Sequence, residues 1–298
     1  MKKLKSKSRS NRNFQIFLHI LFITLCAAVL YPFLLLVGAS FSTERDIIEF
    51  GYQLIPRNFT LEAYRQVFKN TESVLAAYRT TIIYSVVGTF CTVLFDAMFA
   101  YPLTRKRLPG RVAISFFLYF TMLFHGGTVP SYILNTRFLH LNNTIWIYIL
   151  PGMVGAYNVF MMRSFFQGLP EEMFESMRID GASHFNIFFK TVLPLSKPVL
   201  ATVAITVFLA KWNNWYTAML YITDEELISL QYYLQRILKN IQLINTLREQ
   251  GIEMGDQELP SETMRMAMAI VVAGPALFIF PFFQKYFVKG LTIGSVKG

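Results

Sequence analysis

The residues best suited to binding chemistry lie in one apolar stretch, residues 199–222. Its centre carries a cation, two amides and three aromatic side chains: Lys211, Trp212, Asn213, Asn214, Trp215 and Tyr216. Aromatic rings suit the apolar faces of sugars, and amides can both donate to and accept from sugar hydroxyls. Phe208, Trp212, Trp215, Tyr216 and Met219 recur at helical spacing, which predicts one aromatic stripe. We interpret this stretch as a candidate solute path, the alternative being aromatic packing against lipid or neighbouring helices.

Lys211 is an unusual residue for an apolar stretch. A charge near the centre of a membrane helix costs at least about 2.5–3.5 kcal/mol, so it usually faces a cavity or a partner. Two interpretations stay open: contact with an anionic solute such as a uronate, or an internal pair with Asp96 (or extension to the membrane surface). Tyr157 and Asn158 are further candidates for the same path. His125 beside Gly126 and Gly127 fits either a broken helix or a packed helix end.

A short charged segment between two apolar stretches has a distinctive spacing of acids, glycine and proline. Its candidate functional residues are Glu171, Glu172, Glu175, Asp180, Gly181, Ala182, Leu193 and Pro194. Pro170 and the acids after it predict a helix start, and Gly181 predicts the helix end. A second helix is expected from about 183 to 191, ending before Pro194. The helical pattern alone fits an ordinary amphipathic loop equally well.

The elements that carry these residues are apolar helices. The chain has 298 residues, of which 54% are hydrophobic and 15% charged, whereas soluble domains have about 25% charged residues. Six stretches reach the roughly 20 residues that cross a bilayer: 14–38, 80–103, 112–134, 144–164, 199–222 and 264–283. The sequence therefore predicts an all-α, polytopic membrane protein with six transmembrane helices.

Basic residues are distributed unevenly between the loops. They are concentrated before residue 14, in 105–111 and in the C-terminal tail, while acids gather in 223–265. The positive-inside rule makes both termini cytoplasmic, and it accounts for the net charge of +10 without nucleic acid. The expected organisation is a basic N-terminus (1–13), a first membrane helix with an outer loop (14–78), a five-helix core with a cytoplasmic loop at 165–198 (79–290), and a C-terminal tail (291–298).

The charged segment resembles the EAA signature of ATP-binding-cassette importer permeases, which reads Glu-Ala-Ala, three residues, Gly, nine residues, Ile, one residue, Leu-Pro. Glu175, Gly181, Leu193 and Pro194 fall on this pattern, whereas Ser176, Met177 and Thr191 depart from it. Further segments are similar to carbohydrate-uptake permeases related to the inner maltose permease: 124–130, 143–146, 149–152, 162–166, 193–198 and 286–298. The chain is most similar to a subgroup handling oligosaccharides, including those that contain uronate.

The resemblance implies a non-catalytic permease of the type I importer fold in a bacterial cell membrane. It implies as partners a homologous second permease, two ATPase subunits that bind ATP and Mg, an extracytoplasmic binding protein, the lipid bilayer and an oligosaccharide. Glu175 would pair with a basic residue of the ATPase, and Gly181 would permit the turn after the coupling helix. The chain has no Gly-Lys pair, so no phosphate loop, and no metal or cofactor is expected in it.

Two other functions remain as alternatives. A permease for another solute class, such as peptides, would keep the coupling segment and change the solute path. An ion-coupled transporter working alone would need its own ion site, and Asp96 is the one acid within a predicted span.

Overall fold

The computed structural model describes residues 9–179, 181–250 and 262–295, and these residues form helices and no strands. This confirms the predicted all-α class. The α-helices are α1 (Arg9–Ser40), α2 (Glu44–Phe50), α3 (Glu62–Val67), α4 (Thr71–Thr104), α5 (Arg111–Leu123), α6 (Thr128–Ile133), α7 (Trp146–Ile149), α8 (Ala156–Gln167), α9 (Glu171–Ile179), α10 (His184–Ile187), α11 (Leu193–Leu195), α12 (Lys197–Trp212), α13 (Tyr216–Tyr221), α14 (Leu230–Glu249) and α15 (Glu262–Ser295). The described residues also form two short 3₁₀ turns, η1 (Phe68–Asn70) and η4 (Glu225–Leu227), and two π turns, η2 (Leu134–Phe138) and η3 (Phe188–Val192).

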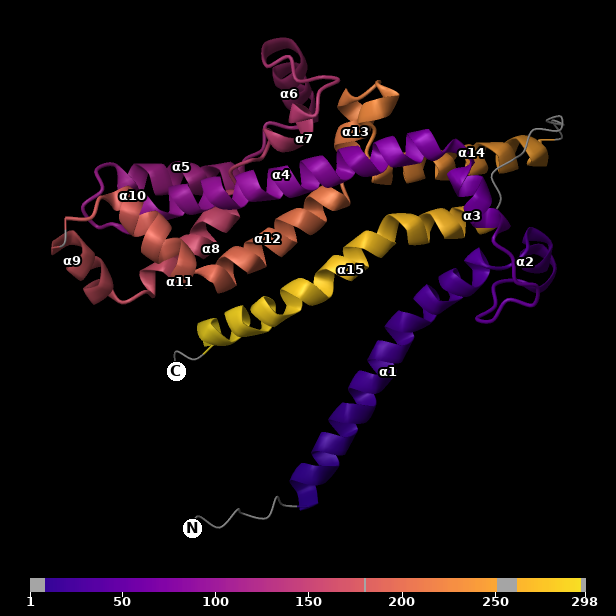
Figure 1. Ribbon diagram of the computed structural model, residues 1–298, viewed down its shortest axis with the longest axis horizontal. Helices are drawn as coiled ribbons and strands as arrows, with labels where there is room; N and C mark the ends of the chain where they lie inside the picture. Colours follow the sequence, from indigo (N-terminus) through magenta and orange to yellow (C-terminus); the bar gives the residue numbers. More distant parts are fainter. Residues whose placement is uncertain (1–8, 180, 251–261, 296–298) are drawn as a thin grey trace. The chain divides into compact units, whose positions relative to one another are not determined.

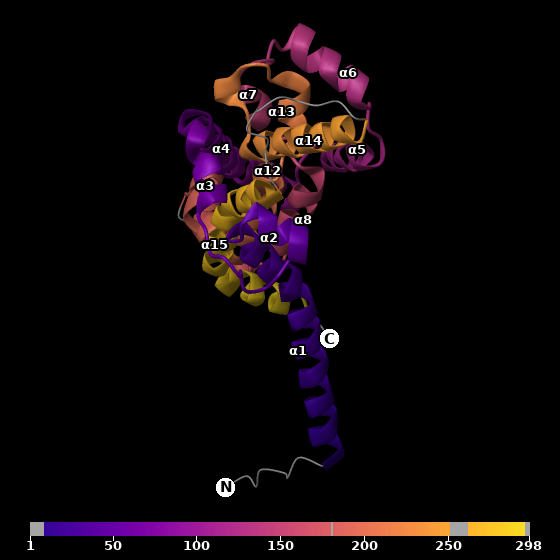
Figure 2. The ribbon, with the colours of Figure 1, turned by 90° about the vertical axis from the view of Figure 1, so that its right-hand side faces the viewer.

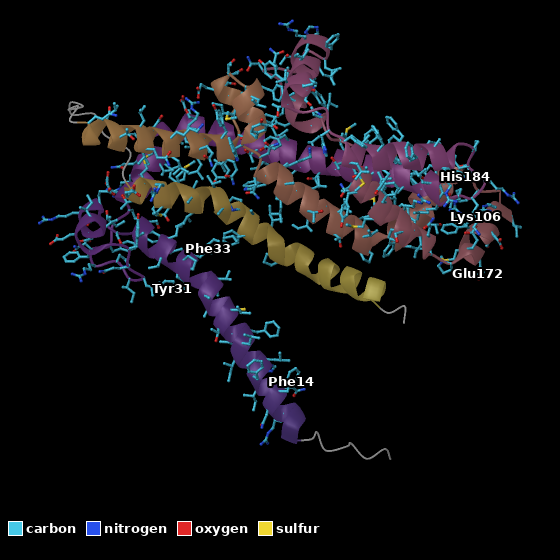
Figure 3. All side chains as sticks on the ribbon, turned by 180° about the vertical axis from the view of Figure 1, so that it is seen from behind. Phe14, Tyr31, Phe33, Lys106, Glu172 and His184 are labelled. Atoms are coloured by element: carbon cyan, nitrogen blue, oxygen red, sulfur yellow. The ribbon has the colours of Figure 1, made fainter. Side chains whose placement is uncertain are left out.

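The described residues divide into two compact units, one within 1–70 and 237–271 and the other within 71–236 and 272–298. In the first unit, α1 is exposed along its membrane-length apolar stretch, and the labelled rings of Phe14, Tyr31 and Phe33 project from it (Figure 3). The carboxylate of Glu44 accepts hydrogen bonds from the backbone N–H groups of Glu262 and Thr263, both at 3.0 Å. This carboxylate caps the start of α15, where free N–H groups need acceptors.

The second unit is built around α4, which packs against α8 and α12 (Figure 1). Small residues of α4, Ala97 and Ala100, are fully buried and let the neighbouring helices approach closely. A second buried cluster joins Tyr84 of α4 to α7 and α13. The helices α6, α7 and α13 lie to one side of α4 in both views (Figures 1 and 2).

Three described helices are long and apolar enough to cross a membrane: Arg12–Ser40, Thr71–Thr104 and Glu262–Ile279. They contain or overlap the predicted spans 14–38, 80–103 and 264–283. Up to five spans result if two bent helix pairs each count as one, and these pairs bend by 112° and 79°.

The three other predicted spans are not single continuous helices in the structure, because turn-forming residues interrupt each of them. Stretch 112–134 breaks between α5 and α6 at Gly126 and Gly127, so the broken-helix interpretation of this segment is correct. Stretch 144–164 divides into α7 and α8 around Pro151, which has no N–H to continue a helix. The 12 residues of α8 extend only about 18 Å. Stretch 199–222 breaks after Trp212.

Candidate coupling surface and solute path

The helix α9 (Glu171–Ile179) begins after Pro170 and stops before Gly181, as the sequence predicts. The N–H of Ala182 donates to the carbonyl of Met177 (2.9 Å) and the N–H of Gly181 to that of Arg178 (3.0 Å). This is a Schellman ending, in which the residue after the cap takes a left-handed conformation. Gly181 has a φ of +75°, and a Cβ added there would meet no atom within 4 Å. The position therefore needs glycine for its backbone conformation and not for space. Asp180 lies outside the described residues.

The inner face of α9 is anchored to the end of α4 by an arginine that follows it. The guanidinium of Arg105 lies over the rings of Tyr101 and Phe174, 4.7 and 4.3 Å from their centroids. Phe174 itself is buried. A cation between two aromatic rings gains electrostatic attraction from both faces, so this stack holds α9 against the core. Sequence reasoning did not single out Arg105 for this role.

Glu171 belongs to this anchor. Its Oε1 pairs with Arg105 Nη1 at 3.4 Å and with Arg178 Nη2 at 3.0 Å. Such exposed pairs contribute little stability, about 0–1 kcal/mol each, but they neutralise Glu171 within the chain. The sequence grouped Glu171 with Glu172 and Glu175, and the structure separates it from them.

The outer face of α9 carries Glu172, Glu175, Ser176 and Ile179, which are all exposed and spaced at i, i+3, i+4 and i+7. Ile179 is 87% exposed. No ion pair to Glu172 or Glu175 is formed within the described part of the chain. Figure 3 shows Glu172 at the same end of the second unit as Lys106 and His184. An exposed isoleucine beside two unneutralised acids suits a partner that has both apolar and basic groups.

Two departures from the EAA pattern contact each other. The hydroxyl of Thr191 donates to the sulfur of Met177 at 2.7 Å. Met177 is half-buried on the inner face of α9 and Thr191 is buried. Met177 thus packs inward, with its sulfur against the Thr191 hydroxyl.

The second predicted helix is longer and less regular than expected. The Ser183 hydroxyl accepts from the N–H of Asn186 and starts α10, which continues through η3 into α11. Pro194 lies inside this helical run, so the predicted end before Pro194 was wrong. The π turn that precedes it accommodates a residue that has no N–H. The run ends at Ser196 and bends by 79° into α12.

Lys211 reaches from α12 toward α4 and α7. Its Nζ donates to the backbone carbonyl of Tyr148 at 3.1 Å, and its stem lies over Gly88, where a Cβ would come 2.9 Å from Lys211 Cε. The rings of Tyr84 and Tyr148 stack beside it with centroids 4.3 Å apart. Tyr84 also donates to the Lys211 carbonyl at 3.1 Å. The two tyrosines were not among the sequence candidates.

The alternative pairing of Lys211 with Asp96 is not formed. The buried Asp96 carboxylate accepts from the N–H of Gly155 at 2.8 Å and from Asn158 Nδ2 at 2.9 Å. Asp96 therefore holds the beginning of α8, and Asn158 is directed to it. Tyr157, the neighbouring candidate, is 64% exposed.

The predicted aromatic stripe does not form, because α12 ends at Trp212. Asn214 takes part in starting α13, where its Oδ1 accepts from the N–H of Thr217 at 3.0 Å, and such side chains compete with helical hydrogen bonds. Trp212 is buried, stacks on Phe208 and donates to the carbonyl of Val272 at 3.1 Å, so it serves helix packing.

Asn213, Trp215 and Tyr216, which follow Trp212, keep polar or aromatic surface at least partly exposed. Asn213 is exposed and accepts from Gln231 Nε2 at 2.9 Å. The rings of Trp215 and Tyr216 meet edge to face at 5.9 Å, and Tyr216 is 45% exposed.

Three comparisons place these features among known proteins. The model of the family described as binding-protein-dependent transport system inner membrane component matches residues 73–293. A polygalacturonan/rhamnogalacturonan transport system permease protein, YtcP of Bacillus subtilis (strain 168), is 35% identical, with 97% of this chain and 99% of the relative covered. Protein LplC of the same organism is 37% identical, covering 91% and 90%. The crystal structure of a bacterial ABC transporter involved in import of the acidic polysaccharide alginate matches with a TM-score of 0.81 and 29% identity, covering 95% of this chain and all of that one.

Proposed function

The chain belongs to the family of binding-protein-dependent transport system inner membrane components, and from this premise we propose that it is the permease subunit of an ATP-driven importer of uronate-containing oligosaccharides. One relative is a permease for polygalacturonan and rhamnogalacturonan, and one solved relative takes part in alginate import. All three are acidic polysaccharides or contain acidic sugars, which supports an anionic cargo for this chain.

The observation that carries the proposal is the position of Lys211. Its ammonium has three N–H donors, and within the described residues it donates to a single uncharged acceptor, the Tyr148 carbonyl. No carboxylate of the described chain pairs with it. A partly buried cation with donors to spare suits a carboxylate carried by the solute, and Asn213, Trp215 and Tyr216, which follow it in the chain, suit the hydroxyls and apolar faces of sugar rings.

The permease performs no bond chemistry in this proposal. Two ATPase subunits bind ATP and Mg in the cytoplasm, a homologous second permease completes the path, and an extracytoplasmic protein delivers the oligosaccharide. The exposed Glu172, Glu175 and Ile179 contact the ATPase, and the Arg105 stack transmits its motion to α4. The interrupted helices at Gly127 and at Asn214 provide irregular backbone beside the path, which membranes tolerate only within protein or along a cavity.

The chain lies in the bacterial cell membrane with both termini in the cytoplasm. The acidic outer segment 223–265 then faces away from the cytoplasm, and the segment 165–198 faces the ATPase subunits. The division into an N-terminal helix with its outer loop (14–78) and a permease core (79–290) is part of the same proposal.

The test compares uptake of a charged and a neutral cargo by the assembled importer in proteoliposomes. Lys211→Met should lower uptake of an oligogalacturonate about tenfold or more, since a charge-assisted hydrogen bond contributes about 1.5–3 kcal/mol. Uptake of the carboxyl-reduced, neutral oligosaccharide should change less than twofold. Lys239→Met, which alters an exposed lysine of α14, is the matched control. Equal loss for both sugars would remove Lys211 from cargo recognition, and transport of peptides in place of both would refute the cargo class.

A further inference from the structure

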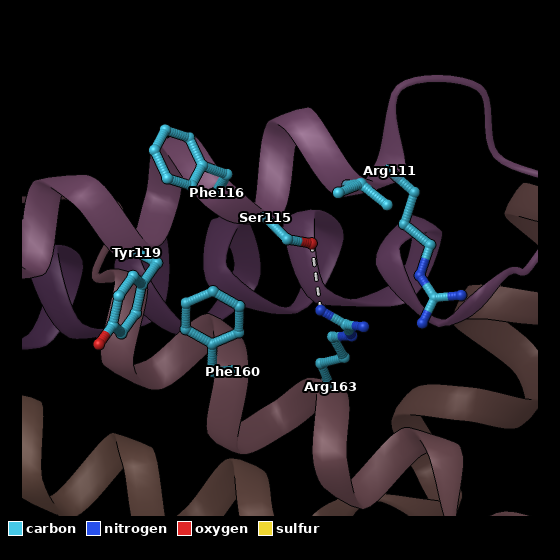
Figure 4. A pocket seen from close by; sticks show the side chains of 7 residues that line it. Arg111, Ser115, Phe116, Tyr119, Phe160 and Arg163 are labelled. Carbon is cyan, nitrogen blue, oxygen red and sulfur yellow. Dashed lines mark hydrogen bonds between the residues drawn. The ribbon is translucent and has the colours of Figure 1, made fainter.

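An open groove of about 570 Å³ lies between α5 and α8, and neither the coupling surface nor the solute path uses it. Figure 4 shows its labelled lining residues: Arg111, Ser115, Phe116, Tyr119, Phe160 and Arg163. The two arginines occupy one side of the view and the three aromatic rings the other. The groove thus has a cationic end and an apolar end.

The order of these residues along the helices follows the depth of a membrane. Arg111 is the first residue of α5, and Tyr119 lies about 12 Å further along the axis. Arg163 Nη1 donates to Ser115 Oγ at 3.1 Å, one turn from the start of α5. An adjoining groove at the same end adds Lys106 and contains no acid. The cationic end is the end that the positive-inside rule assigns to the cytoplasm.

Neither arginine is neutralised by the described part of the chain. No ion pair to Arg111 or Arg163 is formed there, and no acidic residue lines the groove. An arginine within a membrane helix normally faces a partner or a polar path, and two arginines around one opening also repel each other. The two guanidinium charges at this end of the groove therefore favour an anionic partner.

We propose that this groove binds an anionic glycerophospholipid of the cytoplasmic leaflet. The phosphate lies between Arg111 and Arg163, where guanidinium groups can donate two parallel hydrogen bonds to its oxygens. An acyl chain follows Phe116, Tyr119 and Phe160 toward the membrane centre. A free phosphate would leave this apolar half of the groove unused, so the lipid fits both ends.

Lipid retention by the assembled importer tests the proposal. Native mass spectrometry would measure binding of phosphatidylglycerol and of neutral phosphatidylcholine to the wild-type complex and to the double variant Arg111→Gln, Arg163→Gln. Apparent affinity for phosphatidylglycerol should fall about fivefold for each arginine removed, which corresponds to about 1 kcal/mol per basic residue. Affinity for phosphatidylcholine should not change.

Two further variants keep the result interpretable. Arg107→Gln removes one positive charge from the loop before α5, outside the lining of the groove, and should leave lipid binding unchanged. The double variant Arg111→Lys, Arg163→Lys preserves both charges and should retain phosphatidylglycerol. Equal phosphatidylglycerol binding by the wild type and the glutamine variant would overturn the proposal. So would carbodiimide cross-linking of the Arg111→Lys, Arg163→Lys variant to a carboxylate of the second permease, because the groove would then be a protein contact.

Discussion

Replacing Gly181 by Ala tests whether the ending of α9 is required for coupling. An L residue in the left-handed conformation costs about 1–2 kcal/mol, and alanine recovers about 0.4–1 kcal/mol by restricting the unfolded chain. A Cβ at Gly181 meets no atom within 4 Å, so no steric cost is added. The net destabilisation of this ending is about 1 kcal/mol, or about a fivefold loss of the ordered turn.

The assay is solute uptake and ATPase activity of the reconstituted importer, measured on the same preparation. Gly181→Ala should reduce uptake per ATP hydrolysed about fivefold, because α9 and α10 no longer move together. Gly181→Asn should restore most of this loss, since asparagine tolerates the left-handed region.

Gly110 provides the matched control. It has a φ of +71° and equally open surroundings, but it precedes α5 and lies outside the coupling segment. Gly110→Ala should leave uptake per ATP unchanged. If Gly181→Ala keeps the wild-type uptake per ATP, or if Gly110→Ala lowers uptake per ATP by as much, the turn after α9 has no special part in coupling ATP hydrolysis to transport.

Three further predictions concern other parts of the chain. Glu175→Lys should lower solute-stimulated ATPase activity at least tenfold with normal membrane insertion, because it reverses charge on the exposed face of α9; unchanged stimulation would exclude Glu175 from docking. The hydrogen bond with the Thr43 side chain, and after it those with Asn58, lowers the pKa of Asp46 in the folded protein. The ionised Asp46 therefore stabilises the folded protein above the unfolded pKa, and this stability is lost as the pH falls through the lower, folded pKa. Thr43→Val should therefore move this acid-induced loss, measured by thermal unfolding between pH 3 and 5, to higher pH, and an unmoved transition would contradict the assignment. A cysteine at Asn240 should react with a membrane-impermeant maleimide from outside and one at Arg107 only from the cytoplasm; the reverse labelling would invert the topology.

The sequence alone determined the features that depend on a few consecutive residues. Long apolar runs predict α1, α4 and α15, because a membrane helix satisfies its own backbone groups within one segment. The end of α9 at Gly181 was likewise predictable, since a left-handed ending joins residues only five apart in the chain. The interruption at Gly126 and Gly127 was one of two readings that the sequence left open, and backbone conformation decided it.

Tertiary structure decided which side chains those elements bring together. Glu171 and Glu175 are one helical turn apart and alike in type, yet Arg105 from the end of α4 neutralises the first and leaves the second exposed. The spacing of acids within α9 carries no information about an arginine 66 residues away.

The same holds for the solute path. The spacing of Trp212, Asn213 and Asn214 predicted one helix with one face, but the asparagine hydrogen bonds end that helix and the tryptophan packs inward. For Lys211 the sequence left three possibilities open: contact with an anionic solute, a pair with Asp96, or extension to the membrane surface. Gly155 and Asn158 satisfy Asp96, and the Lys211 ammonium donates to the Tyr148 carbonyl instead. The spacing of nearby residues sets where a helix bends. The partner of a buried charge such as Lys211 depends on groups far away in the sequence, because these decide whether an opposite charge such as Asp96 is already satisfied.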